Sequence, residues 1–175
     1  DRQWAKIPSI PADAFMVDME DAAPPDSKLA AREKTLEFLG RPEYFNGRPL
    51  IARCNNLRTP WGLDDLRALS RARAEIVSYP KVETASELRE VIRILAEEGW
   101  IPKLHVMIET ARAVLELDDI VREPRIMGLQ FGYIDLSANA GFQAYDDGRL
   151  FESAYHYPRM KISLAIPGRP AAEAK

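Results

Sequence analysis

The chain has 175 residues, a length that suits one domain with a sizeable core, so residues 1–175 are interpreted as a single domain. Its 24 basic and 27 acidic residues give a formal net charge of −3, which argues against nucleic acid or an anionic membrane as partner and favours a small molecule. The lone Cys54 cannot form an internal disulfide, and no apolar run approaches the roughly 20 residues of a membrane span. Since no signal-peptide pattern opens the chain, a cytoplasmic location is expected, with an organelle as the alternative.

Five short apolar runs alternate with stretches of helical periodicity along the chain. The runs begin roughly 24 to 36 residues apart, which is the length of one βα unit. The expected strands are Ala14–Asp18, Pro49–Asn55, Ala74–Pro80, Leu104–Glu109 and Gly128–Phe131. Five successive units without a hairpin signal predict a parallel α/β fold.

Apolar stripes at helical spacing follow the first four strands and predict helices with one buried face. After the first strand, Asp26 or Ser27 can cap a helix that ends at Gly40. The four stripes are Leu29, Leu36 and Leu39; Leu63, Leu66 and Leu69; Ala85, Leu88, Val91, Ile92 and Leu95; and Ala113, Val114, Leu117, Ile120 and Val121.

The repeating pattern weakens after Gly141, where Ala144–Arg149 predicts a polar loop and Met160–Ile166 a helix. Five strands could form a small doubly wound sheet, but strand ends that all carry polar groups are more typical of one side of a (β/α)₈ TIM barrel. Because such a barrel needs about 200 to 250 residues, the expected fold is a barrel that is incomplete at both ends. It would lack a first strand before residue 1 and the last two strands after residue 175.

Two carboxylates stand at the ends of neighbouring apolar runs. Glu109 ends the fourth expected strand, and Asp135 follows the fifth. Because the carboxyl ends of parallel strands converge on one mouth, we expect the two side chains to lie close together. Carboxylate oxygens suit Mg²⁺, which keeps several waters that substrate oxygens can displace. The alternative is a pair of solvated or helix-capping acids.

Two further features favour packing roles over chemistry. His105 lies inside the apolar run of its expected strand, which favours a hydrogen-bonded histidine between strands over a catalytic base. Gly128, Gly132 and Gly141 are expected to serve tight turns and close packing, since no phosphate-binding glycine spacing is present.

Five motifs, in this order, resemble the family of citrate lyase beta subunits, malyl-CoA and citramalyl-CoA lyases, and related hydroxy-oxo-acid aldolases. They are VDMEDAAPPDSKLAAR (Val17–Arg32), IARCN (Ile51–Asn55), YPKVE (Tyr79–Glu83), MIET (Met107–Thr110) and GLQFGYIDLS (Gly128–Ser137). The resemblance covers nearly the whole chain. It implies a TIM barrel of the phosphoenolpyruvate/pyruvate type, a trimer or hexamer, and Mg²⁺, with Mn²⁺ as a possible substitute.

The resemblance also implies roles for individual residues. Glu109 and Asp135 correspond to the two protein ligands of Mg²⁺, and Arg53 to the residue that pairs with the substrate's carboxylate or carbonyl oxygen. Glu20 and Asp21 match an acidic pair that hydrogen-bonds metal-bound waters; an acidic helix start is the alternative. Lys81 and Lys28 are weaker candidates that could meet a CoA phosphate, and ordinary exposed lysines are the alternative.

The implied reaction is Mg²⁺-dependent cleavage of the carbon–carbon bond of a β-hydroxyacyl-CoA thioester, of the citryl-, malyl- or citramalyl-CoA type, to an acyl-CoA and a 2-oxo acid. The resemblance places the general base beyond residue 175, often on a neighbouring subunit. Two alternatives remain at this point. One is an aldolase that releases pyruvate from a free hydroxy-oxo acid, and the other is a non-catalytic homologue that binds CoA.

Overall fold

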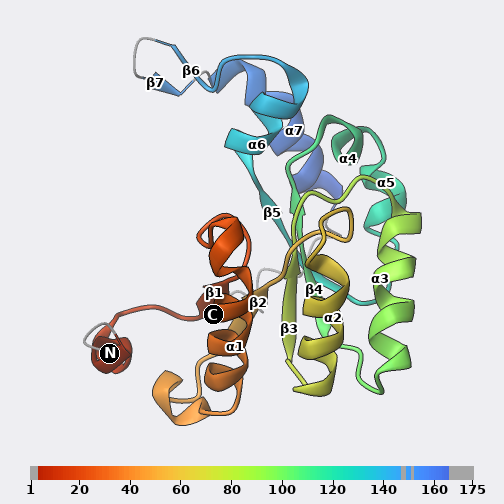
Figure 1. The fold of residues 1–175 in the computed structure, drawn as a ribbon. Coiled ribbons are helices and arrows are strands. Elements are labelled where there is room, and N and C mark those ends of the chain that lie inside the picture. Colours follow the sequence, from red (N-terminus) through yellow and green to blue (C-terminus); the bar gives the residue numbers. More distant parts are fainter. Residues whose placement is uncertain (1–3, 147–148, 151, 166–175) are drawn as a thin grey trace, which may run out of the picture.

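The computed structural model describes residues 4–146, 149–150 and 152–165 (Figure 1). Five parallel strands form one sheet in the order β1 to β5, which confirms the predicted parallel α/β arrangement. The strands are β1 (Phe15–Asp18), β2 (Leu50–Arg53), β3 (Ile76–Tyr79), β4 (Lys103–Ile108) and β5 (Ile126–Phe131). Within the described residues β1 pairs only with β2, and β5 only with β4, so the sheet has two open edges there. Parallel strands in sequential order are consistent with part of a TIM barrel.

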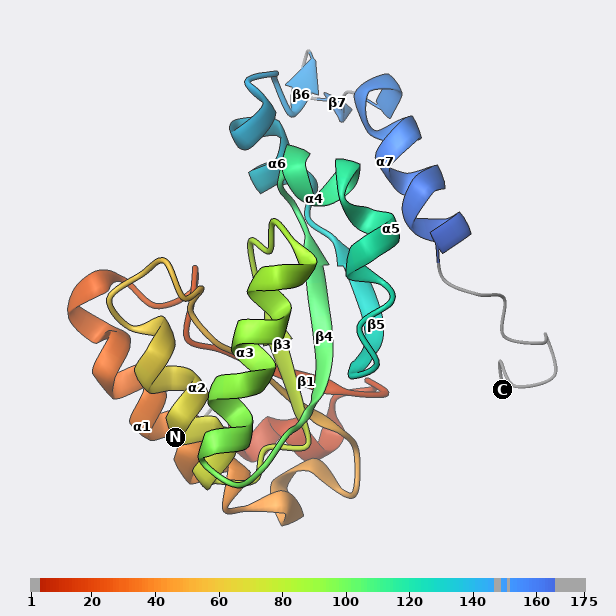
Figure 2. The same cartoon turned by 90° about the vertical axis from the view of Figure 1, so that its right-hand side faces the viewer.

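Helices connect the strands and cover one face of the sheet. The helices are α1 (Lys28–Leu39), α2 (Gly62–Arg71), α3 (Ala85–Glu97), α4 (Ala111–Leu115), α5 (Leu117–Ile120), α6 (Tyr133–Ala140) and α7 (Glu152–Ala165). Three short 3₁₀ turns precede or join them: η1 (Trp4–Ser9), η2 (Pro25–Ser27) and η3 (Pro42–Phe45). Figure 2 shows α1, α2 and α3 side by side, and α2 packs on both α1 and α3. Among the described helices, none is both long and apolar enough to cross a membrane.

The apolar stripes of the second to fourth helical segments are largely confirmed. In α3, for example, Leu88, Val91 and Leu95 are buried in the main core. The stripe predicted for α1 is wrong at Leu29, which is 62% exposed, whereas Leu39 is half-buried and packs against the main core. The fully buried residues of this helix are Lys28, Thr35 and Phe38. Leu63 of α2 is also exposed.

The α1 error has two physical causes. Lys28 turns inward to reach the ends of the strands, and Phe38 joins Ile7 and Phe45 in a second, smaller apolar cluster. The predicted side-chain cap is absent as well, because Ser27 is the last residue of η2 and has a ψ of 0° in place of the extended backbone that an N-cap side chain needs.

The C-terminal part differs in one respect from its prediction. The segment expected to be a polar loop contains β6 (Tyr145–Asp146) and β7 (Arg149–Leu150), which pair antiparallel. Local pairing of such short strands leaves no periodic sequence signal. The predicted helix is present and begins earlier, at Glu152, while Ile166 and the tail after it lie outside the described residues.

One row of residues lies in register across the sheet. Asp18 pairs with Arg53, Arg53 with Ser78, Ser78 with His105, and His105 with Gly128. The His105 Nδ1 atom lies 3.0 Å from Ser78 Oγ, so the prediction of an inter-strand histidine is confirmed. Burial lowers the pKa of His105, which favours the neutral imidazole.

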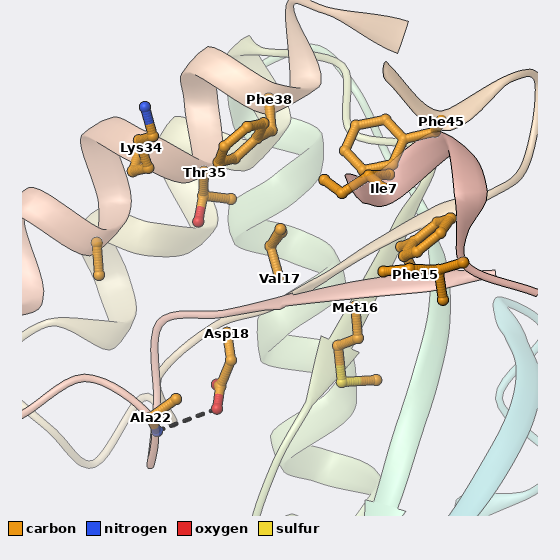
Figure 3. A pocket seen from close by; sticks show the side chains of 12 residues that line it. Ile7, Phe15, Met16, Val17, Asp18, Ala22, Lys34, Thr35, Phe38 and Phe45 are labelled. Atoms are coloured by element: carbon orange, nitrogen blue, oxygen red, sulfur yellow. Dashed lines mark hydrogen bonds between the residues drawn. The ribbon is translucent and has the colours of Figure 1, made fainter. Parts of the chain in front are cut away.

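An apolar pocket of about 460 Å³ lies beside β1. Figure 3 shows Thr35 and Phe38 of α1 on one side of it, Ile7 and Phe45 on another, and Phe15 and Val17 of β1 along its floor. Asp18 is its acidic member, and its side chain accepts a hydrogen bond from the Ala22 backbone. The pocket thus borders the polar strand ends only at Asp18 and Ala22.

Candidate active site

The carboxyl ends of β1 to β4 bring together nearly all of the side chains that the sequence singled out. Arg53 ends β2, Lys81 follows β3, and Glu109 follows β4. Glu20 and Asp21 lie in the turn after β1, and Asp135 lies in the first turn of α6. Contacts link these residues into one cluster, which we call the carboxylate cluster.

Glu109 is the most buried acid of the carboxylate cluster, with 1% of its surface exposed. Its Oε1 atom accepts a hydrogen bond of 2.7 Å from the Lys81 backbone N–H. Burial raises the pKa of Glu109 to about 7, and the charges of Asp135 and Glu20 act in the same direction. A cation beside this carboxylate would therefore be strongly favoured.

Gly132 makes room for Glu109. A Cβ atom at position 132 would lie 2.3 Å from Glu109 Oε2 and 2.6 Å from Glu109 Cβ, both far inside van der Waals contact. The backbone of Gly132 has a φ of −101°, which any residue can adopt. The glycine is thus needed for close packing, as predicted, and not for its conformation.

Lys81 is the cation at the centre of the cluster. Its ammonium contacts Glu20 Oε1 and lies 3.3 Å from Asp21 Oδ1 and 3.5 Å from Asp135 Oδ1. Partial burial alone would lower the pKa of Lys81, but the bond to Glu20 and the neighbouring acids outweigh it and raise that pKa. The side chain is 31% exposed, so it faces the mouth of the site.

Lys81 has an unusual backbone. Its φ of +50° lies in the left-handed region, which is rare for residues other than glycine, asparagine and aspartate. This conformation lets one residue contact the cluster twice, since its N–H binds Glu109 and its ammonium binds Glu20. No sequence signal marks such a backbone.

Arg53 is held by Asp18, its partner on the neighbouring strand. The Arg53 Nε and Nη2 atoms donate to the two Asp18 carboxylate oxygens at 2.7 and 2.5 Å. The third nitrogen, Nη1, lies 3.1 Å from Glu20 Oε2 and 3.7 Å from Asp21 Oδ2. Burial raises the pKa of Asp18, but hydrogen bonds from Arg53 and from backbone N–H groups outweigh burial, so that pKa lies below its ordinary value.

Glu20 links the two cations of the site. It is 6% exposed, its Oε1 contacts Lys81, and its Oε2 faces Arg53 without the geometry of a hydrogen bond. Burial raises the pKa of Glu20, and the bond from Lys81 opposes this only in part. Glu20 therefore has an oxygen with unused capacity to accept a hydrogen bond, such as one from a bound water.

Lys28 lies in a different environment from the one that the sequence suggested. It is buried, and its ammonium donates to Met19 O at 3.0 Å, Glu20 O at 2.6 Å and Asn55 Oδ1 at 2.8 Å. The expectation of an ordinary exposed lysine is wrong for this residue. These contacts favour a role in fixing the turn that carries Glu20 over a contact with a CoA phosphate.

Two polar residues around the site were missed by sequence reasoning. Asp65 of α2 is fully buried and accepts from Asn55 and Arg32, which anchors the Lys28 network. Glu87 of α3 accepts from the Tyr79 hydroxyl at 2.7 Å. The signal for Glu87 was present, since TASE at 84–87 is a capping-box pattern, and the Thr84 side chain does accept the Glu87 N–H.

The donor set fits Mg²⁺ with two protein carboxylates and water. Within the described residues, no three His, Cys, Asp or Glu side chains converge to hold a metal ion directly. Glu109 and Asp135 lie close enough for the Asp135 charge to raise the pKa of Glu109. Two carboxylates with open water positions are a common arrangement for Mg²⁺, which retains several waters.

Comparisons with known proteins agree with this site. The family model described as HpcH/HpaI aldolase/citrate lyase matches residues 3–166. A (3S)-malyl-CoA thioesterase of Cereibacter sphaeroides is 33% identical over 78% of this chain and 46% of its own length. The malyl-CoA/beta-methylmalyl-CoA/citramalyl-CoA lyase of Chloroflexus aurantiacus is 31% identical over 79% of this chain and 43% of its own length.

A solved structure supports the fold. The protein CitE from Mycobacterium tuberculosis, in complex with magnesium, acetoacetate and coenzyme A, superposes with a TM-score of 0.75 at 27% sequence identity. The match covers 94% of this chain and 57% of that one. The chain spans about half the length of the curated relatives it matches. Because the family model matches residues 3–166, nearly the whole chain, the chain belongs to the HpcH/HpaI aldolase/citrate lyase family.

Proposed function

We propose that this protein is a Mg²⁺-dependent carbon–carbon lyase. Its substrate would be a β-hydroxyacyl-CoA thioester of the citryl-, malyl- or citramalyl-CoA type, and its products an acyl-CoA and a 2-oxo acid. The observation that carries the proposal is the carboxylate cluster, in which buried Glu109 and Asp135 both contact Lys81. Lys81 is linked through Glu20 to the oriented guanidinium of Arg53. Relatives named for malyl-CoA and citramalyl-CoA support the choice of substrate class.

Glu109 and Asp135 would hold the metal ion. Bound Mg²⁺ supplies a Lewis acid that stabilises negative charge on a substrate oxygen. Arg53 would bind the substrate's carboxylate or carbonyl oxygen through Nη1, because Asp18 occupies Nε and Nη2. A guanidinium keeps its proton at all relevant pH values and can stabilise an enolate oxygen as the bond breaks.

Glu20 and Asp21 would orient metal-bound water from the turn after β1. Glu20 Oε2 is suited to this role because it has no hydrogen bond within the described residues. The general base is proposed to lie outside residues 1–175, as the sequence resemblance implies. The trimeric or hexameric state and the cytoplasmic location stay predictions.

A second candidate is hydrolysis of the thioester itself. The first relatives, at 33% to 34% identity, are named (3S)-malyl-CoA thioesterases. The same site could bind such a substrate, since its carboxylate and carbonyl groups would meet the same Arg53 and metal. The aldolase and the non-catalytic CoA-binding alternatives make different predictions for the same assay.

The test is a panel of citryl-, malyl- and citramalyl-CoA beside free hydroxy-oxo acids, each with Mg²⁺ and with a chelator. A lyase releases a 2-oxo acid and acyl-CoA, whereas a thioesterase releases free CoA and leaves the carbon–carbon bond intact. Release of 2-oxo acid from free acids alone would move the protein to the aldolase class. Binding of CoA without any product would identify a non-catalytic homologue.

The variant Glu109→Gln tests the metal assignment. It keeps the shape of the side chain and removes its charge, so Mg²⁺ affinity should fall by about 100-fold, roughly the upper end of the effect of losing support at a metal site. Glu43→Gln is the matched control, because Glu43 is an exposed acid of the η3 turn, which precedes the amino end of β2. Unchanged affinity in Glu109→Gln would refute the assignment.

A further inference from the structure

The carboxylate cluster contains more negative than positive groups. Its four carboxylates, from Glu20, Asp21, Glu109 and Asp135, share the cations Arg53 and Lys81, and Arg53 is also paired with Asp18 outside the cluster. Two of the three Arg53 nitrogens donate hydrogen bonds to Asp18. Lys81 is therefore the cation that neutralises the remaining part of the cluster, around Glu109 and Asp135.

The position of Lys81 is enforced from outside the cluster. Its carbonyl oxygen accepts from Arg58 Nη2 at 2.5 Å and from Asn56 Nδ2 at 3.3 Å. Both donors also bind the Glu87 carboxylate, Arg58 at 2.9 Å and Asn56 at 2.8 Å. Glu87 is in turn held by Tyr79.

The next residue of the same loop is held as well. The Thr110 hydroxyl donates to the Val82 carbonyl at 2.8 Å. Because Thr110 directly follows Glu109, this bond ties the Lys81 loop to the turn that carries the proposed metal ligand. The left-handed backbone of Lys81 is thus fixed on both sides, and only its flexible four-carbon side chain is free to move.

We propose that Lys81 is a built-in counter-ion, whose ammonium occupies the cation position of the carboxylate cluster in the metal-free protein and swings out towards solvent when a divalent cation binds. This inference rests on the proposed Mg²⁺ site. It replaces the predicted contact of Lys81 with a CoA phosphate as the main role of this side chain. The 31% exposure of the side chain gives it a path to solvent without any change in the backbone.

The proposal has a direct energetic consequence. An ammonium that lies 3.5 Å from Asp135 competes with a divalent cation for the same carboxylate. Lys81 would therefore weaken metal binding. Without metal, its ammonium would reduce the repulsion between the carboxylates of the cluster. Removal of its charge should strengthen metal binding and destabilise the metal-free protein.

The test measures Mg²⁺ and Mn²⁺ affinity by calorimetry on the purified, metal-free protein, with no substrate present. Lys81→Met keeps an unbranched side chain close to the length of the lysine stem and removes its charge, and it should bind Mg²⁺ at least about tenfold more tightly, as expected when a unit charge close to a divalent cation is lost. Lys81→Arg keeps the charge and should bind no more tightly than wild type. Lys103→Met, at the opposite end of β4, removes one exposed lysine and controls for net charge.

Thermal unfolding gives a second readout. Without metal, Lys81→Met should melt below wild type, and saturating Mg²⁺ should raise its melting temperature more than that of wild type. Equal or weaker Mg²⁺ binding in Lys81→Met, with a folded protein, would overturn the counter-ion role and leave the proposed lyase function standing. Absence of Mg²⁺ binding in both proteins would overturn the counter-ion role and the metal assignment together.

Discussion

Two lysines contact Glu20, and they differ in what surrounds them. Lys28 is buried and donates to two backbone carbonyls and the Asn55 amide. Lys81 is partly exposed and contacts three carboxylates. The acceptors of Lys28 are therefore neutral, whereas the partners of Lys81 are carboxylates.

The difference separates a residue that builds the site from a residue that takes part in it. A buried cation that donates to three acceptors is costly to move, because the charge would lose three hydrogen bonds inside the protein. A half-exposed cation among several carboxylates can be replaced by another cation at little cost. Lys28 thus fixes where Glu20 lies, and Lys81 sets how strongly the site attracts a metal.

The largest effect is expected for Lys28→Met. The substitution removes three hydrogen bonds from a buried ammonium, which should lower the free energy of unfolding by about 3 kcal/mol or more. Met19 O keeps the Asn55 Nδ2 donor and Glu20 O keeps the Ala23 N–H, so the loss falls mainly on Asn55 Oδ1. Chemical denaturation measures this loss. Lys103→Met should stay within about 0.5 kcal/mol of wild type, as expected for an exposed surface residue. A similar small effect for Lys28→Met would abolish the contrast between the two lysines.

Gly132→Ala should lower Mg²⁺ affinity more than it lowers the stability of the protein. The added Cβ would overlap Glu109 Oε2 at 2.3 Å, so the Glu109 side chain must move and Mg²⁺ affinity should fall by about tenfold to 100-fold, like other losses of support around a metal ligand. Gly128→Ala is the matched control, because its Cβ would lie 3.7 Å from His105 Cδ2, an ordinary contact. Equal affinity in both variants would show that Glu109 is not the ligand that the clash displaces.

The site residues that the sequence predicted are those whose position follows from the apolar runs that mark the strands. Arg53, Glu109 and Asp135 each follow an apolar run of strand length, and parallel strands must present such residues at one edge. The predicted packing role of Gly132 was also within reach, because it follows β5 directly.

The missed features depend on contacts between distant parts of the chain. The inward turn of Lys28 depends on Asn55, 27 residues away, and the apolar positions of α1 gave no hint of it. The left-handed backbone of Lys81 depends on Arg58 and Asn56 from another loop. Neither a local pattern nor a residue preference encodes such contacts, so only the folded chain reveals them.

The smallest effect is expected for Asp18→Asn, which tests whether Arg53 resembles Lys28 in being fixed or Lys81 in being exchangeable. Asparagine keeps the shape of Asp18 but turns one acceptor of Arg53 into a donor, so the guanidinium should lose its orientation and kcat should fall by about tenfold, the size of one charge-assisted hydrogen bond. Mg²⁺ affinity should change less, because Arg53 contacts neither Glu109 nor Asp135.

A second readout of Asp18→Asn is stability at low pH. The pKa of Asp18 is lowered from 3.8, so its stabilising contribution is present above that pH and is lost as the pH falls through the lower, folded value. The variant should therefore lose less stability than wild type below about pH 4. If neither kcat nor the loss of stability at low pH changes in the variant, Asp18 does not orient Arg53, and the orientation of the guanidinium comes from the strand alone.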